Sequence, residues 1–178
     1  DHKGLQNTDL GLANEMAINQ FIAHHSVIFQ PEKRLMWVST SPWQCGKYVA
    51  YDLNKIFKDT IDWQHEIYSS DLTIPEDKFI DTPEFQHLLT YKKLTPLLLK
   101  KIRKKEQIEE SVLKTYQASN PSLYYVYEVI GDYYEAMQQS KQAIAYWQQA
   151  LKKSIPKLQE KERIQQKIQK QSKDGKES

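Results

Sequence analysis

Residues 13–57 read ANEMAINQFIAHHSVIFQPEKRLMWVSTSPWQCGKYVAYDLNKIF, and this stretch contains the pattern of a β-hairpin. Its segments 21–29 (FIAHHSVIF) and 35–40 (LMWVST) are rich in β-branched and aromatic residues, which favour strands. Residues 30–34 (QPEKR) between them contain the proline and the charges of a tight connection. Because two strands alone do not form a stable sheet in water, we expect the hairpin (21–40) to belong to a larger sheet.

The hairpin and the segment after it resemble a known family in HHSVIFQPEKRLMWVS (24–39) and SPWQCGKYVAYDLN (41–54). The family is the acyl-coenzyme A:6-aminopenicillanic acid acyltransferase-like branch of the N-terminal-nucleophile (Ntn) hydrolases, especially its longer bacterial members. The resemblance covers residues 13–101, closely at first and loosely toward the end. It implies an α+β fold in which the hairpin supplies C-terminal strands of a four-layer αββα sandwich.

Enzymes of this family use an N-terminal cysteine, freed by self-cleavage, as nucleophile and its own α-amino group as base. Cys45 is the only cysteine here and lies in continuous chain, so a structural loop thiol is its favoured interpretation. The resemblance therefore implies the C-terminal portion of an amidase or acyltransferase acting on an amide C–N bond. We expect no catalytic residue in this chain, and an upstream segment of the same protein is expected to supply the nucleophile and complete the sandwich. Export to the periplasm or beyond is implied by the family alone.

Two residues after the second expected strand are the candidates for substrate binding. Ser41 and Trp43 lie where, by the resemblance, the chain passes near the acyl pocket, and loops after strands often carry sites on rigid scaffolds. The indole of Trp43 would form a wall for an acyl chain. The alternative is a core position, which is the commoner role of a tryptophan.

Other classes of site find no support in the sequence. His24 and His25 are adjacent on an expected strand, so their side chains point to opposite faces and cannot share a metal ion. No metal-binding motif and no glycine-rich phosphate loop is present, so we expect neither a metal nor another cofactor.

The mean hydropathy is -0.73 and no apolar run approaches the roughly 20 residues of a membrane span, so no membrane partner is expected. Asp1 in place of an initiator methionine favours a processed or cloned end.

The C-terminal segment, residues 151–178, is basic. It contains nine lysine and arginine residues against four acidic ones, but it has no aromatic residue that could stack on a base. A solvated helix is therefore favoured over a nucleic-acid site. Ile164 and Ile168 form one thin apolar stripe, which is typical of a capping helix. We expect residues 172–178 to be disordered.

Between the hairpin and this segment the sequence changes from strand to helix patterns. Residues 47–57 fit a strand or a buried apolar segment, and residues 59–81 are expected to be irregular, with a turn at 74–77. Thr82 and Pro83 are a helix start signal, which predicts a short helix through residue 91. Thr95 and Pro96 repeat the signal and predict a second, long helix that ends before Pro121 and is bent near Lys105.

Residues 124–156 resemble one tetratricopeptide repeat, in which two antiparallel helices approach closely at small residues. The expected packing residues are Tyr127, Gly131 and Tyr134 on the first helix and Ala143, Trp147 and Ala150 on the second. Pro156 ends the unit one residue later than the repeat pattern expects.

The division expected is residues 1–94 as the Ntn-like portion, 95–171 as the helical region and 172–178 as the tail. The alternative function is a non-enzymatic interaction module whose helical region binds a peptide or protein.

Overall fold

The computed structural model describes residues 4–17, 20–21, 23, 25–58 and 67–174. The chain is a mixed α+β protein with two compact units, Phe21–Phe85 and Asp1–Gln20 joined with Gln86–Ser178. We call them the sheet unit and the helical unit. None of the helices in the described part is long and apolar enough to cross a bilayer.

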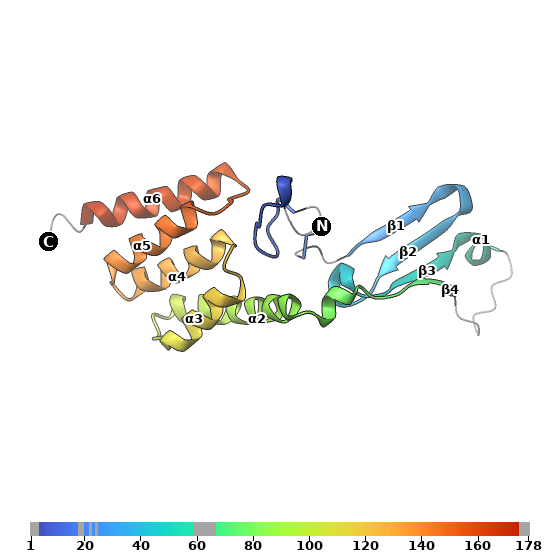
Figure 1. The fold of residues 1–178 in the computed structure, drawn as a ribbon, viewed down its shortest axis with the longest axis horizontal. Coiled ribbons are helices and arrows are strands. Elements are labelled where there is room, and N and C mark those ends of the chain that lie inside the picture. Colours follow the sequence, from blue (N-terminus) through green and yellow to red (C-terminus); the bar gives the residue numbers. More distant parts are fainter. Residues whose placement is uncertain (1–3, 18–19, 22, 24, 59–66, 175–178) are drawn as a thin grey trace. The chain divides into compact units, whose positions relative to one another are not determined.

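Among its described residues, the sheet unit contains one antiparallel sheet of four strands in the order β1-β2-β3-β4 (Figure 1). The strands are β1 (Val27–Gln30), β2 (Leu35–Ser39), β3 (Tyr48–Asp52) and β4 (Ser69–Ile74). The expected hairpin corresponds to β1 and β2, which pair with Val27 opposite Val38 and Gln30 opposite Leu35. The expected first strand over 21–29 is wrong at its start, since β1 begins at Val27 and the described residues 21, 23, 25 and 26 are not in a strand. A short 3-10 helix, η2 (Pro31–Lys33), connects them.

The sequence left the type of residues 47–57 open, and the structure has β3 followed by a one-turn helix, α1 (Leu53–Ile56). The expectation of an irregular segment over 59–81 is wrong for β4, whereas residues 59–66 lie outside the described part. The sequence of β4, SSDLTI, has only a short alternation at Leu72 and Ile74, and its contacts with other strands stabilise it in the sheet. It pairs with β3, and the indole N–H of Trp37 on β2 donates to the Leu72 carbonyl at 2.8 Å.

Aromatic rings form part of the core of the sheet unit, beside two short 3-10 helices, η3 (Trp43–Cys45) and η4 (Lys78–Asp81). Phe21 is fully buried and stacks on Phe79 with ring centroids 5.3 Å apart. Phe85 meets the edge of Phe79 at 5.9 Å. These contacts connect the start of the unit to its end, since Phe21 and Phe85 are its terminal residues.

The helix α2 (Pro83–Arg103) is continuous, so the predicted second start at Thr95 and Pro96 is wrong. Proline removes the backbone donor that would bond to the carbonyl of residue 92. The bond from Thr95 Oγ1 goes to another carbonyl, that of Tyr91, at 2.8 Å. Burial of Leu88 and Leu98 holds the helix before and after the proline. The helix ends after Arg103, where Lys105 adopts a φ of 54°, and α3 (Glu110–Ser119) follows.

Three further helices follow in the described part of the chain, namely α4 (Tyr124–Ala136), α5 (Ser140–Leu151) and α6 (Leu158–Asp174). The core of the helical unit includes the fully buried side chains of Tyr116, Ile130, Trp147 and Ile164. The expectation of a disordered tail from residue 172 is wrong for 172–174, which continue α6. Residues 175–178 lie outside the described part.

The N-terminal segment packs on the helices, which differs from the expected division at residue 94. Asn120 holds it with two bonds, since its side chain accepts from the Leu12 backbone N–H at 3.1 Å and donates to the Leu12 carbonyl at 2.7 Å. The buried Asn14 side chain donates to the Ser154 carbonyl at 3.1 Å. A short 3-10 helix, η1 (Leu5–Asn7), precedes these contacts.

Candidate functional site

The two candidate substrate-binding residues lie in and beside η3. Ser41 is exposed, and Trp43 is half-buried in a left-handed backbone conformation with a φ of 47°. The Trp43 ring meets the edge of the Phe85 ring, with centroids 6.2 Å apart. Trp43 thus contacts the aromatic core of the sheet unit, which is the alternative role considered for it.

Cys45 is fully buried and has the properties of a structural thiol. Burial, and next the nearby Asp77 carboxylate, raise the pKa of the Cys45 thiol from 9.0 to about 11. Because the thiolate is the nucleophilic form, a thiol with this pKa is poorly suited to nucleophilic catalysis.

We expect Cys45 to react slowly with a thiol reagent such as Ellman's reagent at pH 8 in the folded protein and quickly in urea. The folded thiol keeps its proton to higher pH than the unfolded one, so folding is favoured below pH 9 and this contribution is lost as the pH rises toward about 11. The chain has one cysteine, so the absorbance change reports this site alone. Equal rates in the folded and the unfolded protein would contradict the burial of Cys45.

The histidines and the acidic residues do not form a metal site in the part of the chain that the structure describes, where no cluster of three ligating side chains is found. His25 is exposed beside β1, and His24 lies outside the described residues.

The residues expected to pack in the repeat-like unit lie at the contact between α4 and α5. Trp147, Ala143 and Ala150 are fully buried. A Cβ atom on Gly131 would lie 2.5 Å from the Trp147 indole, so only glycine fits there. The remaining two residues are tyrosines: Tyr127 is buried and donates to the Pro121 carbonyl at 2.8 Å, and Tyr134 stacks on Tyr146 with centroids 5.4 Å apart.

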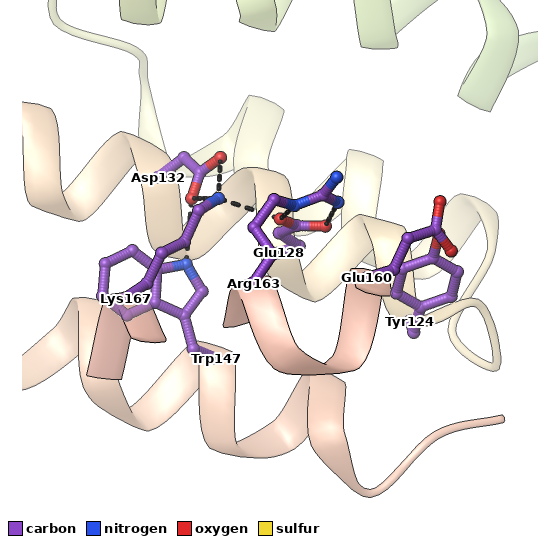
Figure 2. A network of polar contacts seen from close by, with 7 residues as sticks. All are labelled: Tyr124, Glu128, Asp132, Trp147, Glu160, Arg163 and Lys167. Atoms are coloured by element: carbon purple, nitrogen blue, oxygen red, sulfur yellow. Dashed lines mark hydrogen bonds and ion pairs between the residues drawn. The ribbon is translucent and has the colours of Figure 1, made fainter. Parts of the chain in front are cut away.

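A polar network connects α4 with α6, and the sequence reasoning did not foresee it (Figure 2). Glu128 is only 2% exposed and accepts from the Arg163 guanidinium through both carboxylate oxygens, at 3.0 and 2.9 Å. The Lys167 ammonium lies between two carboxylates, 2.8 Å from Glu128 and 2.7 Å from Asp132. The Trp147 indole N–H donates to Asp132 at 2.9 Å, so the network extends to α5. We call these five residues the α4–α6 clasp.

The electrostatics of the clasp follow from burial and pairing. Burial raises the pKa of Asp132, and the Lys167 charge opposes this rise only in part. Burial acts to lower the pKa of Lys167, but Asp132 and Glu128 more than reverse this effect, so the pKa is raised. Lys167 also lies over the Trp147 ring, 5.7 Å from its centroid. Each charge of the clasp has an opposite partner, which is the arrangement of a structural network.

One signal in the sequence could have indicated the clasp. Glu128 and Asp132 are four residues apart, as are Arg163 and Lys167, so each pair lies on one face of its helix. The prediction of a solvated helix for the basic C-terminal segment is wrong for Lys167, which is 24% exposed, whereas Arg163 is 48% exposed and still pairs with Glu128. The capping stripe is confirmed, since Ile164 is fully buried and Ile168 packs against the core.

The strand β1 exposes apolar side chains at the edge of the sheet. It is an edge strand in the sheet order, and its sequence VIFQ contains neither charge nor proline. Val27, Ile28 and Phe29 are 43%, 41% and 63% exposed. Edge strands usually carry charges, prolines or a covering segment, so β1 has the features of a strand that another segment covers.

No protein-family model, no curated protein and no solved structure matches this chain.

Proposed function

We propose that this chain is the C-terminal portion of an Ntn amidase or acyltransferase that acts on an amide C–N bond. The observation that carries the proposal is the exposed apolar surface of β1. In a four-layer sandwich, a sheet is covered by a second sheet and extended by strands from elsewhere in the protein. The exposed side chains of Val27, Ile28 and Phe29 are suited to such a neighbour.

In this proposal the catalytic cysteine belongs to an upstream segment of the same protein. The buried Cys45 and its raised pKa agree with that division of roles, because its thiol is shielded and protonated at neutral pH. The sheet unit would support the acyl pocket, with Ser41 and Trp43 at its border. The finer assignment of the helical unit, a tetratricopeptide-like appendage, is part of the same proposal.

The proposal is tested by producing this chain alone and, separately, the whole reading frame that encodes it. Both products are assayed for amine release from N-acyl aminocoumarin amides with short and long acyl chains. We expect no hydrolysis by this chain and hydrolysis by the larger product, with mass spectrometry finding a mature N-terminal cysteine on its upstream segment. Hydrolysis by this chain alone, or an upstream region without such a cysteine, would refute the proposal.

A pair of variants tests the covering of β1. Phe29→Ser should leave the stability of this chain unchanged, because Phe29 is 63% exposed, but it should reduce activity in the larger product. Phe57→Ser is the matched control, since Phe57 is 79% exposed and lies outside the sheet. Equal activities of the two variants in the larger product would count against β1 as the covered strand.

A second candidate function is a tetratricopeptide-like interaction module without enzymatic activity. The packing of α4 against α5 supports it, with Gly131 against Trp147 at the close approach. This candidate requires the sheet to be self-contained, so the chain alone should sediment as a folded monomer. Strong aggregation of the isolated chain would favour the first proposal.

A further inference from the structure

A hollow lies in the helical unit between the C-terminal half of α2, the start of α3 and the residues that connect them. Its volume is about 140 Å³, and it is lined by Leu97, Leu98, Lys101, Ile108, Glu109 and Val112. Leu98 and Ile108 form a buried floor, whereas Leu97 is 44% exposed, so the hollow is open to solvent. An apolar cavity of roughly 150 Å³ can hold one benzene molecule, so this hollow has the size for one leucine or phenylalanine side chain.

The α2 side of the hollow is basic, whereas the connection and the start of α3 contain Glu106, Glu109 and Glu110. From Gln86 to Arg103, α2 has no acidic residue, and its cations are Lys92, Lys93, Lys100, Lys101 and Arg103. With about 3.6 residues per turn, Lys100 and Lys101 lie one turn after Leu97, and Lys101 lines the hollow. Lys100 is exposed and Lys101 is half-buried. The C-terminal end of α2 therefore combines positive charge with an apolar opening, and an anionic ligand with one apolar group would match both.

We propose that this hollow is the docking site of an acidic peptide segment with one leucine- or phenylalanine-sized side chain. The apolar side chain enters between Leu97 and Val112, and the flanking carboxylates face Lys100 and Lys101. Glu109 on the opposite rim repels carboxylates, so it directs the acidic flank of the peptide toward α2. A single small hollow with an acidic rim favours a peptide over an anionic lipid surface, which would need a continuous apolar and basic face.

This site belongs wholly to the helical unit and is independent of the proposed amidase role. It is tested on the full chain with a fluorescent peptide, acetyl-Glu-Asp-Glu-Leu-Asp-Glu-amide, by fluorescence anisotropy at low salt. The control peptide has serine in place of leucine. We expect binding of the leucine peptide that weakens as salt is added, and weakening of about tenfold or more with the serine peptide, since the apolar contact is lost.

Variants locate the peptide on the surface. Leu97→Ser and Lys101→Glu should each weaken binding about tenfold, because one removes an apolar wall and the other reverses a facing charge. Leu89→Ser and Lys93→Glu are matched controls on the same helix, with Lys93 roughly 12 Å from Lys101 along the helix axis. These controls should change binding less than about threefold. Leu97 is partly exposed, so Leu97→Ser keeps the test valid if Lys101→Glu does not fold, as judged by circular dichroism.

Three outcomes would overturn the proposal. The first is the absence of peptide binding at low salt. The second is equal binding of the leucine and serine peptides, or equal weakening by Lys93→Glu and Lys101→Glu, which would indicate unspecific attraction to positive charge. The third is binding to phosphatidylglycerol vesicles without binding to the peptide, which would assign the basic α2 side of the hollow to a lipid surface.

Discussion

Replacing Trp147 by alanine should lower the free energy of unfolding of the helical unit by about 3 to 5 kcal/mol, the range for large aromatic truncations in a core. Trp147 is fully buried, fills the space opposite Gly131 and donates its indole N–H to Asp132. Alanine would leave a cavity and remove this donor from the clasp. Both losses act on the same contact between α4 and α5, so the effect should be among the largest in the chain.

The measurement is urea unfolding followed by circular dichroism, with hydrogen exchange to locate the loss. Trp37→Ala is the matched control, because Trp37 is half-buried in the sheet unit and donates to the Leu72 carbonyl. Faster exchange should be confined to the helical unit for Trp147→Ala and to the sheet unit for Trp37→Ala. No loss of stability in Trp147→Ala would show that the packing of α4 against α5 is wrong.

Replacing Glu128 by alanine should lower the free energy of unfolding by about 2 to 4 kcal/mol, because it removes the centre of a buried charge network. Arg163 would lose both of its hydrogen bonds to Glu128, and Lys167 would lose one of its two carboxylates. The expected loss lies toward the lower end for buried ion pairs, since Arg163 is 48% exposed and Lys167 keeps Asp132.

Glu110→Ala is the control, because Glu110 forms a fully exposed ion pair with Lys114 at 2.8 Å. Exposed pairs contribute little, so this variant should unfold at nearly the same urea concentration as the unmodified chain. In an Arg163→Ala background, Glu128→Ala should lower the free energy of unfolding by less than it does in the unmodified chain, because the two residues share one contact. Additive effects of the two substitutions would contradict the direct pairing of Glu128 with Arg163.

The elements that the sequence could identify are those stabilised by neighbours close in the chain. The hairpin needs two runs of strand formers around a proline-containing connection, and β1 and β2 lie there. The close approach of α4 and α5 could be inferred from a glycine and a tryptophan at the spacing of one helical hairpin. The candidate residues Ser41 and Trp43 came from a family resemblance, and the contact of Trp43 with Phe85 is a separate fact of the structure.

By itself, the sequence of this protein determined the α+β class, the hairpin, the helix start at Pro83 and the small and large residues between α4 and α5. Only the tertiary structure decided that β4 is a strand, that α2 continues through Pro96 and that Arg163 and Lys167 pair with α4. The physical reason is the range of the interactions. A strand or turn signal acts over a few residues, whereas Glu128 and Arg163 are 35 residues apart, and their pattern on each helix is the same whether the charges face water or each other.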